Sequence, residues 1–229
     1  VAISDIRKNT FKQIARRDSF NSSCCRLHTV GHDCSVGKMV VSLELERGLK
    51  ARGRDACFVA TGQTGIMVSG AGLPIDCMVA DFVNGAAEKL VLDTQHHELI
   101  VVEGQGSLVH PSYSAVTLGL LHGCAPHALV FVFEAGRDTV GGLEHVPLPS
   151  LRKQRELFET MASIYQPCET IGFAMNGRRL SKPQADEVAR TIEAEMGLPV
   201  VDVIRDGSDK LVDAAEAFYQ SNRWKTAQG

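Results

Sequence analysis

The sequence lacks long apolar stretches and any large surplus of one charge. Its longest purely apolar run, Ala128 to Phe133, is far shorter than the roughly 20 residues that a membrane-spanning helix needs, and no secretory apolar segment opens the chain. The 24 basic and 27 acidic residues give a formal net charge of −3, which does not indicate a surface for nucleic acid. We therefore expect a soluble, cytoplasmic protein with neither a membrane nor a nucleic-acid partner.

Paired cysteines are also absent. The seven cysteines are an odd number and contain no Cys-x-x-Cys pair, while a chain of 229 residues with 44% apolar residues can bury a core without disulfides. We predict reduced thiols. No group of His, Cys and Asp residues has the spacing of metal ligands, so we predict no metal site.

Short apolar runs alternate with longer amphipathic segments along most of the chain. This alternation predicts an α/β fold, a three-layer sandwich with a mostly parallel sheet of six or more strands. The expected strands are Leu27–Val30, Ala56–Ala60, Leu99–Val102, Ala128–Phe133, Thr170–Met175 and Val200–Val203. The expected helices are Lys38–Arg52, Val79–Leu92, Tyr113–His122, Leu151–Tyr165, Pro183–Met196 and Ser208–Arg223.

The start of the chain differs in composition from the rest. Residues 1–26 are polar and basic and end in a turn-forming Asn-Ser-Ser stretch. We expect them to form a linker or leading arm outside the core, and residues 27–229 to form one α/β domain. Val1 stands where an initiator methionine would be, which suggests a fragment or a processed chain.

The loop after the first strand has the composition of a phosphate site. It reads Gly31-His-Asp-Cys-Ser-Val-Gly37-Lys38 and leads into a helix, so its N–H groups and the lysine can converge on an anion. The spacing of its glycines is one residue longer than in the common P-loop and resembles the loop of dethiobiotin synthetase. The expected phosphate-binding residues are Gly31, Asp33, Cys34, Ser35, Val36, Gly37, Lys38 and Met39.

One feature of this loop departs from Mg-ATP chemistry. A nucleotide-hydrolysing P-loop has Ser or Thr after its lysine to hold Mg²⁺. Here Met39 and Val40 follow, and the nearest hydroxyl on the helix is that of Ser42. The loop therefore keeps a phosphate cradle without its metal ligand, which counts against Mg-ATP chemistry and leaves binding of another phosphate compound open.

The loops after the next strands carry further polar residues, which parallel strands would bring to one edge of the sheet. Glu103 and His110 are candidate general bases, and Arg137 offers a planar fork for a carboxylate or phosphate. The expected substrate-binding residues are Thr61, Gln63, Thr64, Asp81, Gln105, Ser107 and Arg137. Alternatives stay open for several of these: an ordinary turn around Gln63, pairing of Glu103 with Lys38 only, a surface role for Arg137, and a helix-capping role for Asp81.

Taken together, five segments resemble one family of bacterial and archaeal proteins. They begin at Gly31 (GHDCSVGKM), Ala60 (ATGQTG), Ala80 (ADFVNGAAE), Val102 (VEGQGSLVHP) and Leu118 (LGLLHG). The family is the carboxy-terminal P-loop domain long labelled as of unknown function, whose members include D-glutamate N-acetyltransferase. The resemblance covers about residues 26–224 and implies a P-loop NTPase-like fold, use of acetyl-CoA, a homo-oligomer and an additional amino-terminal domain in full-length relatives. Relatives commonly carry threonine where this chain has Val40.

Joined to this resemblance, the residues suggest an acetyl-CoA-dependent N-acetyltransferase acting on a D-glutamate-like amino acid. Lys38 and the loop backbone would bind the CoA phosphates, and Glu103 or His110 would take the proton of the attacking amine. Ser107 or a loop N–H would donate to the thioester oxygen. Cys34 is a candidate acyl carrier, because a helix N-terminus acidifies a thiol.

Two alternatives remain at this point. One is an ATP- and Mg²⁺-dependent ligase or kinase of dethiobiotin-synthetase type, with Asp33 and Glu103 holding the metal. The other is a non-catalytic module that binds a nucleotide or CoA.

Overall fold

A computed structural model of the chain describes residues 5–8 and 10–225. Its centre is a six-stranded sheet in which every neighbouring pair is parallel, in the order β2-β3-β1-β4-β7-β8. The prediction of an α/β fold with a parallel sheet is confirmed. The strands are β1 (Cys25–Gly31), β2 (Ala56–Val59), β3 (Leu99–Val102), β4 (Ala128–Glu134), β7 (Glu169–Asn176) and β8 (Val200–Val201).

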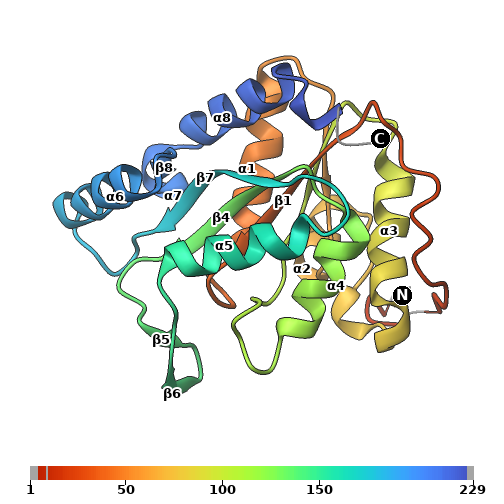
Figure 1. The fold of residues 1–229 in the computed structure, drawn as a ribbon, viewed down its shortest axis with the longest axis horizontal. Coiled ribbons are helices and arrows are strands. Elements are labelled where there is room, and N and C mark those ends of the chain that lie inside the picture. Colours follow the sequence, from red (N-terminus) through yellow and green to blue (C-terminus); the bar gives the residue numbers. More distant parts are fainter. Residues whose placement is uncertain (1–4, 9, 226–229) are drawn as a thin grey trace, which may run out of the picture.

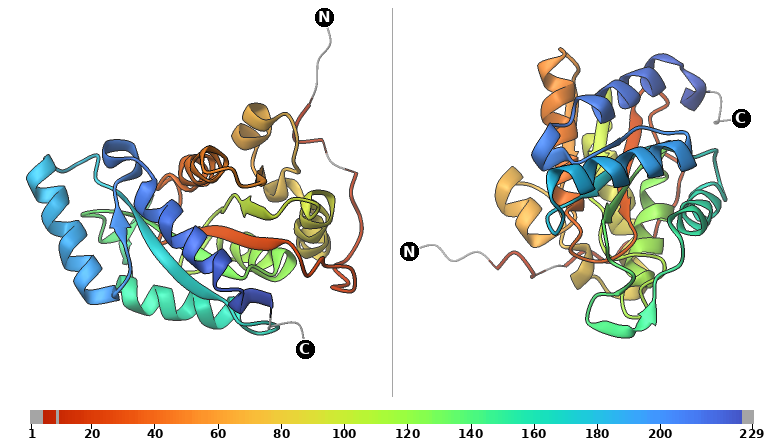
Figure 2. Two further views of the ribbon diagram at one scale, coloured as in Figure 1. Left: turned by 90° about the horizontal axis from the view of Figure 1, so that it is seen from above. Right: turned by 90° about the vertical axis from the view of Figure 1, so that its left-hand side faces the viewer.

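Helices cover both faces of this sheet (Figures 1 and 2). Alternate residues of a strand point to opposite faces, so that Leu99 and Val101 pack with α1 and α8, while Ile100 and Val102 pack with α3 and α4. The six predicted helices are confirmed within a few residues at their ends. They are α1 (Lys38–Ala51), α3 (Val83–Thr94), α4 (Ser114–Cys124), α5 (Leu151–Ala162), α6 (Lys182–Met196) and α8 (Asp209–Gln220).

Several short elements were not predicted from the sequence. The loop around Gln63 contains a seven-residue helix, and the segment after β4 forms an antiparallel hairpin that projects from the body (Figure 1). The predicted strand Val200–Val203 stops at Val201, because Asp202 caps the next helix with its side chain. These elements are α2 (Gln63–Ser69), α7 (Val203–Asp206), β5 (Thr139–Val140), β6 (Leu143–Pro147), η1 (Ile75–Cys77), η2 (Ala80–Phe82) and η3 (Arg223–Lys225).

The leading segment is attached to the domain, contrary to the prediction that it lies outside the core. Phe11 and Phe20 pack against the apolar cluster under α3, and the carboxylate of Glu88 on α3 accepts hydrogen bonds from the N–H groups of Arg16 and Arg17, each at 2.7 Å. The predicted boundary at residue 26 also moves, because β1 begins at Cys25. Residues 1–4, 9 and 226–229 of the two predicted ranges lie outside the described residues.

The amino end of β1 is closed by a buried polar cluster. The Arg26 side chain is fully buried and donates from Nε to the Ala125 carbonyl at 2.7 Å and from Nη2 to Gln166 Oε1 at 3.1 Å. Its guanidinium lies 4.7 Å from the centre of the Phe20 ring. Burial lowers the pKa of Arg26 to about 10. Beside this cluster lies Trp224, which is buried and donates from its indole N–H to the Tyr219 carbonyl at 3.0 Å.

Within residues 5–8 and 10–225, we find no helix that combines the length and the apolar character needed to cross a membrane.

Candidate functional site

The loop between β1 and α1 is shaped to receive an anion. Ser35 and Gly37 both have positive φ, 56° and 112°, and only glycine adopts the second of these readily. A backbone with positive φ at alternate residues turns successive N–H groups toward one side of the loop. The N–H groups of residues 37–40 make no hydrogen bond within the part of the chain that the structure describes, and the first turn of α1 holds no acidic residue. The predicted phosphate cradle therefore has free donors at a positive helix end.

Lys38 lies under this loop. Its side chain is buried and donates from Nζ to the carbonyl of Asp33 at 2.8 Å. Burial lowers the pKa of Lys38 to about 8, so the ammonium group is still charged at neutral pH. A phosphate in the loop would give this partly desolvated charge an anionic partner.

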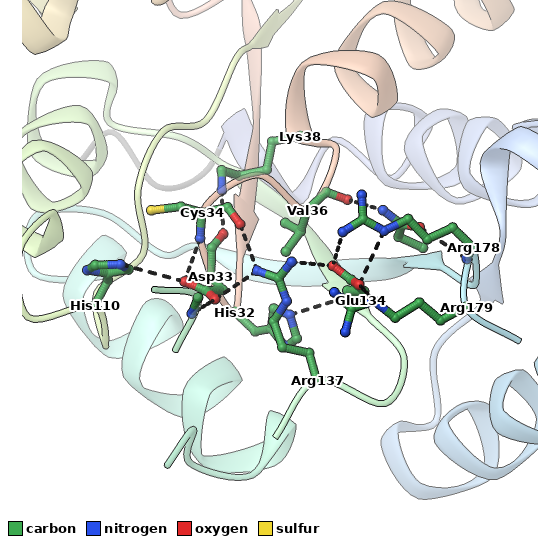
Figure 3. Close-up of polar contacts among 12 residues, drawn as sticks. His32, Asp33, Cys34, Val36, Lys38, His110, Glu134, Arg137, Arg178 and Arg179 are labelled. Atoms are coloured by element: carbon green, nitrogen blue, oxygen red, sulfur yellow. Dashed lines mark hydrogen bonds and ion pairs between the residues drawn. The ribbon is translucent and has the colours of Figure 1, made fainter. Parts of the chain in front are cut away.

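Asp33 fastens the loop and does not face its cavity. Its carboxylate accepts hydrogen bonds from the N–H groups of Cys34 and Gly141, both at 2.7 Å, and from Arg137 Nη1 at 2.8 Å (Figure 3). Burial alone would raise the pKa of Asp33, but these three hydrogen bonds bring it below its usual value. Asp33 therefore stays ionised as a structural anchor of the loop, in place of the predicted contact with phosphate.

The prediction that Arg137 binds a substrate carboxylate is corrected by its surroundings. One side of its fork contacts Asp33 and the carbonyl of Cys34 at 3.0 Å, and the other pairs with Glu134 (Figure 3). Only 12% of the side chain is exposed. Both carboxylates belong to the protein, so the fork has no side left for a substrate.

Glu103 presents a carboxylate oxygen to the cavity. Its Oε2 accepts from the N–H groups of Thr61 at 2.9 Å and Gly62 at 3.1 Å, whereas Oε1 makes no hydrogen bond to a described residue. Burial raises the pKa of Glu103, although these two N–H groups and the charge of Lys38 oppose the shift. A carboxylate with a raised pKa and one free oxygen suits a general base.

The residues around Glu103 hold it in place. Thr61 is buried and donates from its hydroxyl to the Glu103 carbonyl at 2.9 Å, so it positions Glu103 and has no exposed group for a substrate. At the next residue, a Cβ on Gly104 would lie 1.7 Å from the Thr29 carbonyl oxygen, and the Gly104 N–H donates to Thr29 Oγ1 at 3.0 Å. Only glycine allows this close approach.

The cleft between the loop and Glu103 has a volume of about 580 Å³. Of the predicted substrate-binding residues, it brings together Gln63 and Thr64 from α2 and Gln105 from the loop after β3. Ser107 is buried away from this cleft, and Asp81 is exposed on η2 outside it, so neither supports the predicted contact. The lining is formed by Cys34–Val40, Gly62–Thr64, Asp76 and Glu103–Gly106.

His110 is not arranged as a base. It is buried, and its Nδ1 accepts a hydrogen bond from the N–H of Ser112 at 3.1 Å. In the neutral ring the proton then sits on Nε2, which lies 4.0 Å from Asp33 Oδ1. With no lone pair left to accept a proton, His110 does not fit the predicted role, and Glu103 is the better candidate.

The structure also brings Asp33, Cys34 and His110 together, with one potential metal-ligand atom of each within 4.8 Å of the others. The sequence spacing gave no sign of this cluster. Its hydrogen bonds do not suit a metal, because Asp33 has three donors and Nε2 of His110 carries the proton. Burial raises the pKa of Cys34, which is opposite to the acidification expected for an acyl carrier.

The described residues do not fit Mg²⁺ either. The hydroxyl of Ser42 is buried between Thr29 Oγ1, at 2.8 Å, and the Lys38 carbonyl, at 3.0 Å. Asp33 is engaged by an arginine and two N–H groups, and one oxygen of Glu103 by two further N–H groups. Of these three residues, only Glu103 Oε1 is left without a hydrogen bond to a described residue, so Mg²⁺ would have one carboxylate oxygen and no hydroxyl beside Lys38.

A parallel sheet whose central strand leads through a glycine-containing anion loop into a helix defines a P-loop α/β protein. Comparison with known proteins agrees. Residues 12–212 match the family described as a domain of unknown function (DUF1611_C), P-loop domain, and the chain belongs to this family. A solved structure of a DUF1611 family protein from Anabaena variabilis is 39% identical, with a TM-score of 0.87, covering 93% of this chain and 63% of that one.

Two curated relatives are called D-glutamate N-acetyltransferase. The protein from Pseudoalteromonas is 44% identical over 82% of this chain, and that from Tritonibacter scottomollicae is 41% identical over 84%. The matches span 57% and 58% of the relatives' own lengths. Cobyrinic acid a,c-diamide synthase from Mycobacterium smegmatis, solved with ADP and magnesium, is 12% identical over 87% of this chain and 97% of its own, with a TM-score of 0.56, and shares the fold alone.

Proposed function

We propose that this domain binds acetyl-CoA through the loop between β1 and α1 and transfers the acetyl group to the amino group of a D-glutamate-like amino acid. The observation that carries this proposal is the composition of one cleft: free N–H donors of residues 37–40, the charge of Lys38 and a free oxygen of Glu103 line it together. The names of the two curated relatives indicate the acceptor.

The phosphate end of the donor is bound without a metal in this proposal. The N–H groups at the start of α1 can donate together to one anion, and Lys38 supplies a compact positive charge. CoA carries a pyrophosphate that such a cradle can hold. Among the described residues, the Ser42 hydroxyl and the Asp33 carboxylate are engaged by the protein, so they do not serve as ligands of Mg²⁺, and this favours CoA over Mg-ATP.

Glu103 moves the proton. Acetyl-CoA supplies the acetyl group as a thioester. As the acceptor's nitrogen bonds to the acetyl carbon and the carbon–sulfur bond breaks, Oε1 of Glu103 accepts the proton that the amine loses. Glu103 then gives this proton to the leaving sulfur, which becomes the thiol of CoA, and the carboxylate is restored. The raised pKa of Glu103 brings this carboxylate closer to the pKa expected of a base working at neutral pH.

The acceptor amino acid is held by the polar residues of the same cleft. Gln63 and Thr64 offer amide and hydroxyl donors to its carboxylates. The amide nitrogen of Gln105 already donates to the carbonyl and hydroxyl oxygens of Thr61, so Gln105 shapes the cleft beside them. Asp76, which was not among the predicted substrate-binding residues, also lines the cleft. Its Oδ2 pairs with Arg7 Nη2 at 3.2 Å, and its Oδ1 can contact the amino group.

Binding measurements separate this proposal from the alternatives. Calorimetry of the purified protein should show binding of acetyl-CoA, and a thiol-release assay should show acetyl transfer to D-glutamate. Tight binding of Mg-ATP with no response to acetyl-CoA would contradict the proposal in favour of the ligase or kinase. Binding of acetyl-CoA without transfer to any amino acid, in this chain and in a full-length protein assayed in parallel, would favour the non-catalytic module.

Replacing Lys38 tests the phosphate cradle. Lys38→Ala should lower acetyl transfer by about 100-fold, because it removes a buried charge from the phosphate site. Lys50→Ala is the matched control, since Lys50 lies on the same helix with 55% of its side chain exposed and pairs only with Glu46. Undiminished transfer by Lys38→Ala would show that the loop does not bind the donor.

A further inference from the structure

The other side of the phosphate loop carries positive charge that the proposed chemistry does not use. Glu134 ends β4 with its side chain fully buried, and three arginines surround its carboxylate: Arg137, Arg178 and Arg179 (Figure 3). Asp33 and Glu103 are the other carboxylates of this region, and Lys38 adds a fourth cation. A protein with net charge −3 therefore has a local positive excess beside the loop.

The three arginines differ in what they leave free. Arg137 is enclosed by Asp33 and Glu134. Arg178 donates to Glu134 from Nε at 3.3 Å and from Nη2 at 3.1 Å, whereas the ion pair of Arg179 with Glu134 is from Nε, at 2.8 Å. The side chains of Arg178 and Arg179 are 55% and 59% exposed. The Nη groups of Arg179 make no hydrogen bond to a described residue and can donate to an anion.

The fold connects this arginine pair to the phosphate loop. Arg178 and Arg179 follow Asn176, the last residue of β7, whose Nδ2 donates to the carbonyl of Val36 in the loop at 3.1 Å. A small hollow of about 140 Å³, lined by Val36, Gly37, Val40, Met175 and Asn176 among others, lies between the loop and the end of β7. A group attached to a phosphate in the loop has space on this side.

We propose that Arg178 and Arg179 bind the 3′-phosphate of CoA. This inference rests on the proposed function, because it takes CoA as the ligand of the loop. In CoA the 3′-phosphate and the pyrophosphate are attached to the same ribose, so a second anion must lie near the first. Two guanidinium groups held by one buried carboxylate suit a phosphate, since their planar forks are already oriented.

Dephospho-CoA, which lacks only the 3′-phosphate, provides the test. Calorimetry on the unaltered protein should show CoA binding about tenfold more tightly than dephospho-CoA, the effect of one or two charge-assisted contacts at an exposed site. Arg179→Ala should lower the affinity for CoA toward that for dephospho-CoA and leave the latter unchanged. The double variant Arg178→Ala/Arg179→Ala should abolish the remaining difference.

Arg190→Ala is the matched control, because Arg190 is 70% exposed and pairs with a single carboxylate, Glu187, on α6. It should leave both affinities unchanged. Equal binding of CoA and dephospho-CoA to the unaltered protein would overturn the inference and leave the proposed function standing. An equal loss of both ligands in Arg179→Ala would also overturn it, because a structural role predicts that result. Binding of neither ligand to the unaltered protein would overturn the proposed function and this inference with it.

Discussion

The two ends of strand β1 bury comparable polar groups and use them differently. At the amino end, the Arg26 guanidinium donates to the Ala125 carbonyl and the Gln166 side chain and stacks on Phe20. At the carboxyl end, Lys38 contacts one carbonyl, and four neighbouring N–H groups have no partner within the described chain. One end uses its polar groups to join segments of the protein, whereas the other leaves donors open toward a cleft.

This difference indicates where stability and function reside. A buried cation that is hydrogen-bonded by the protein contributes to the fold, and its removal takes those hydrogen bonds away. A buried cation with open donors around it costs stability until a ligand arrives. Substitutions at the amino end should therefore change unfolding, and substitutions at the carboxyl end should change binding or catalysis.

The largest effect is expected for Glu103→Gln. The amide can still accept the N–H groups of Thr61 and Gly62, but it cannot take a proton, so acetyl transfer should fall by about 100- to 10,000-fold. Calorimetry should show acetyl-CoA binding within about twofold of the unaltered protein. Glu98→Gln, at the amino end of β3, serves as the control. Transfer within about threefold of the unaltered rate would show that Glu103 is not the base.

Arg26→Ala should test the opposite end. The loss of a fully buried side chain and its two hydrogen bonds should lower the free energy of unfolding by about 3 kcal/mol. Acetyl transfer by the folded fraction should be unchanged. Urea denaturation gives the stability, and Arg47→Ala, at an exposed position on α1, should change it by less than about 0.5 kcal/mol. A stable Arg26→Ala variant with weak acetyl-CoA binding would remove the distinction between the two ends.

The pH dependence of binding should report on Lys38. Because burial lowers its pKa to about 8, the ammonium is charged below that pH and neutral above it. The affinity for acetyl-CoA should therefore fall by about tenfold between pH 7 and pH 9. Lys38→Arg, whose guanidinium keeps its charge in this range, should bind with a flatter profile. An equally steep decline in that variant would assign the titration to another group.

The smallest effect is expected for Val40→Thr, which adds a hydroxyl at the start of α1. The change nearly preserves side-chain shape, and Asp33 would remain occupied by Arg137. Acetyl transfer should therefore stay within about twofold, and Mg-ATP should still bind less tightly than acetyl-CoA. A strong gain in Mg-ATP affinity, measured by calorimetry, would show that the missing hydroxyl alone excludes the metal.

Much of the fold could be predicted from the sequence, because Leu99–Val102 and Ala128–Phe133 are buried on both faces and form unbroken apolar runs. Helix α2 could not be predicted, since its seven residues, with glycine at the third position, are too few to show a helical repeat of apolar residues. The hairpin after β4 is similarly short. A homo-oligomer and a cytoplasmic location stay predictions.

The position of the candidate site was predicted better than the contacts among its side chains. The loop at Gly31–Lys38 and the carboxylate of Glu103 follow from local sequence, because each sits directly after a strand. The partners of Arg137 and the proton position on His110 depend on Asp33, Glu134 and the Ser112 N–H. The pairing of Arg137 with Asp33 arises only when two separate loops meet, so it carries no local signal. The contacts of Arg137 with Glu134 and of His110 with Ser112 are local, but they depend on the exact turn of each loop, which the residue types do not specify.

Trp224 gives the chain a built-in optical probe. It is the one tryptophan in the sequence, and it stacks on Tyr219 near His127, at the same end of the sheet as Arg26. Its fluorescence emission should shift to longer wavelength when that end opens to water, and should stay constant while a nucleotide-like compound is titrated into the distant cleft. One spectrometer trace therefore follows melting, and a separate calorimetric titration follows occupancy.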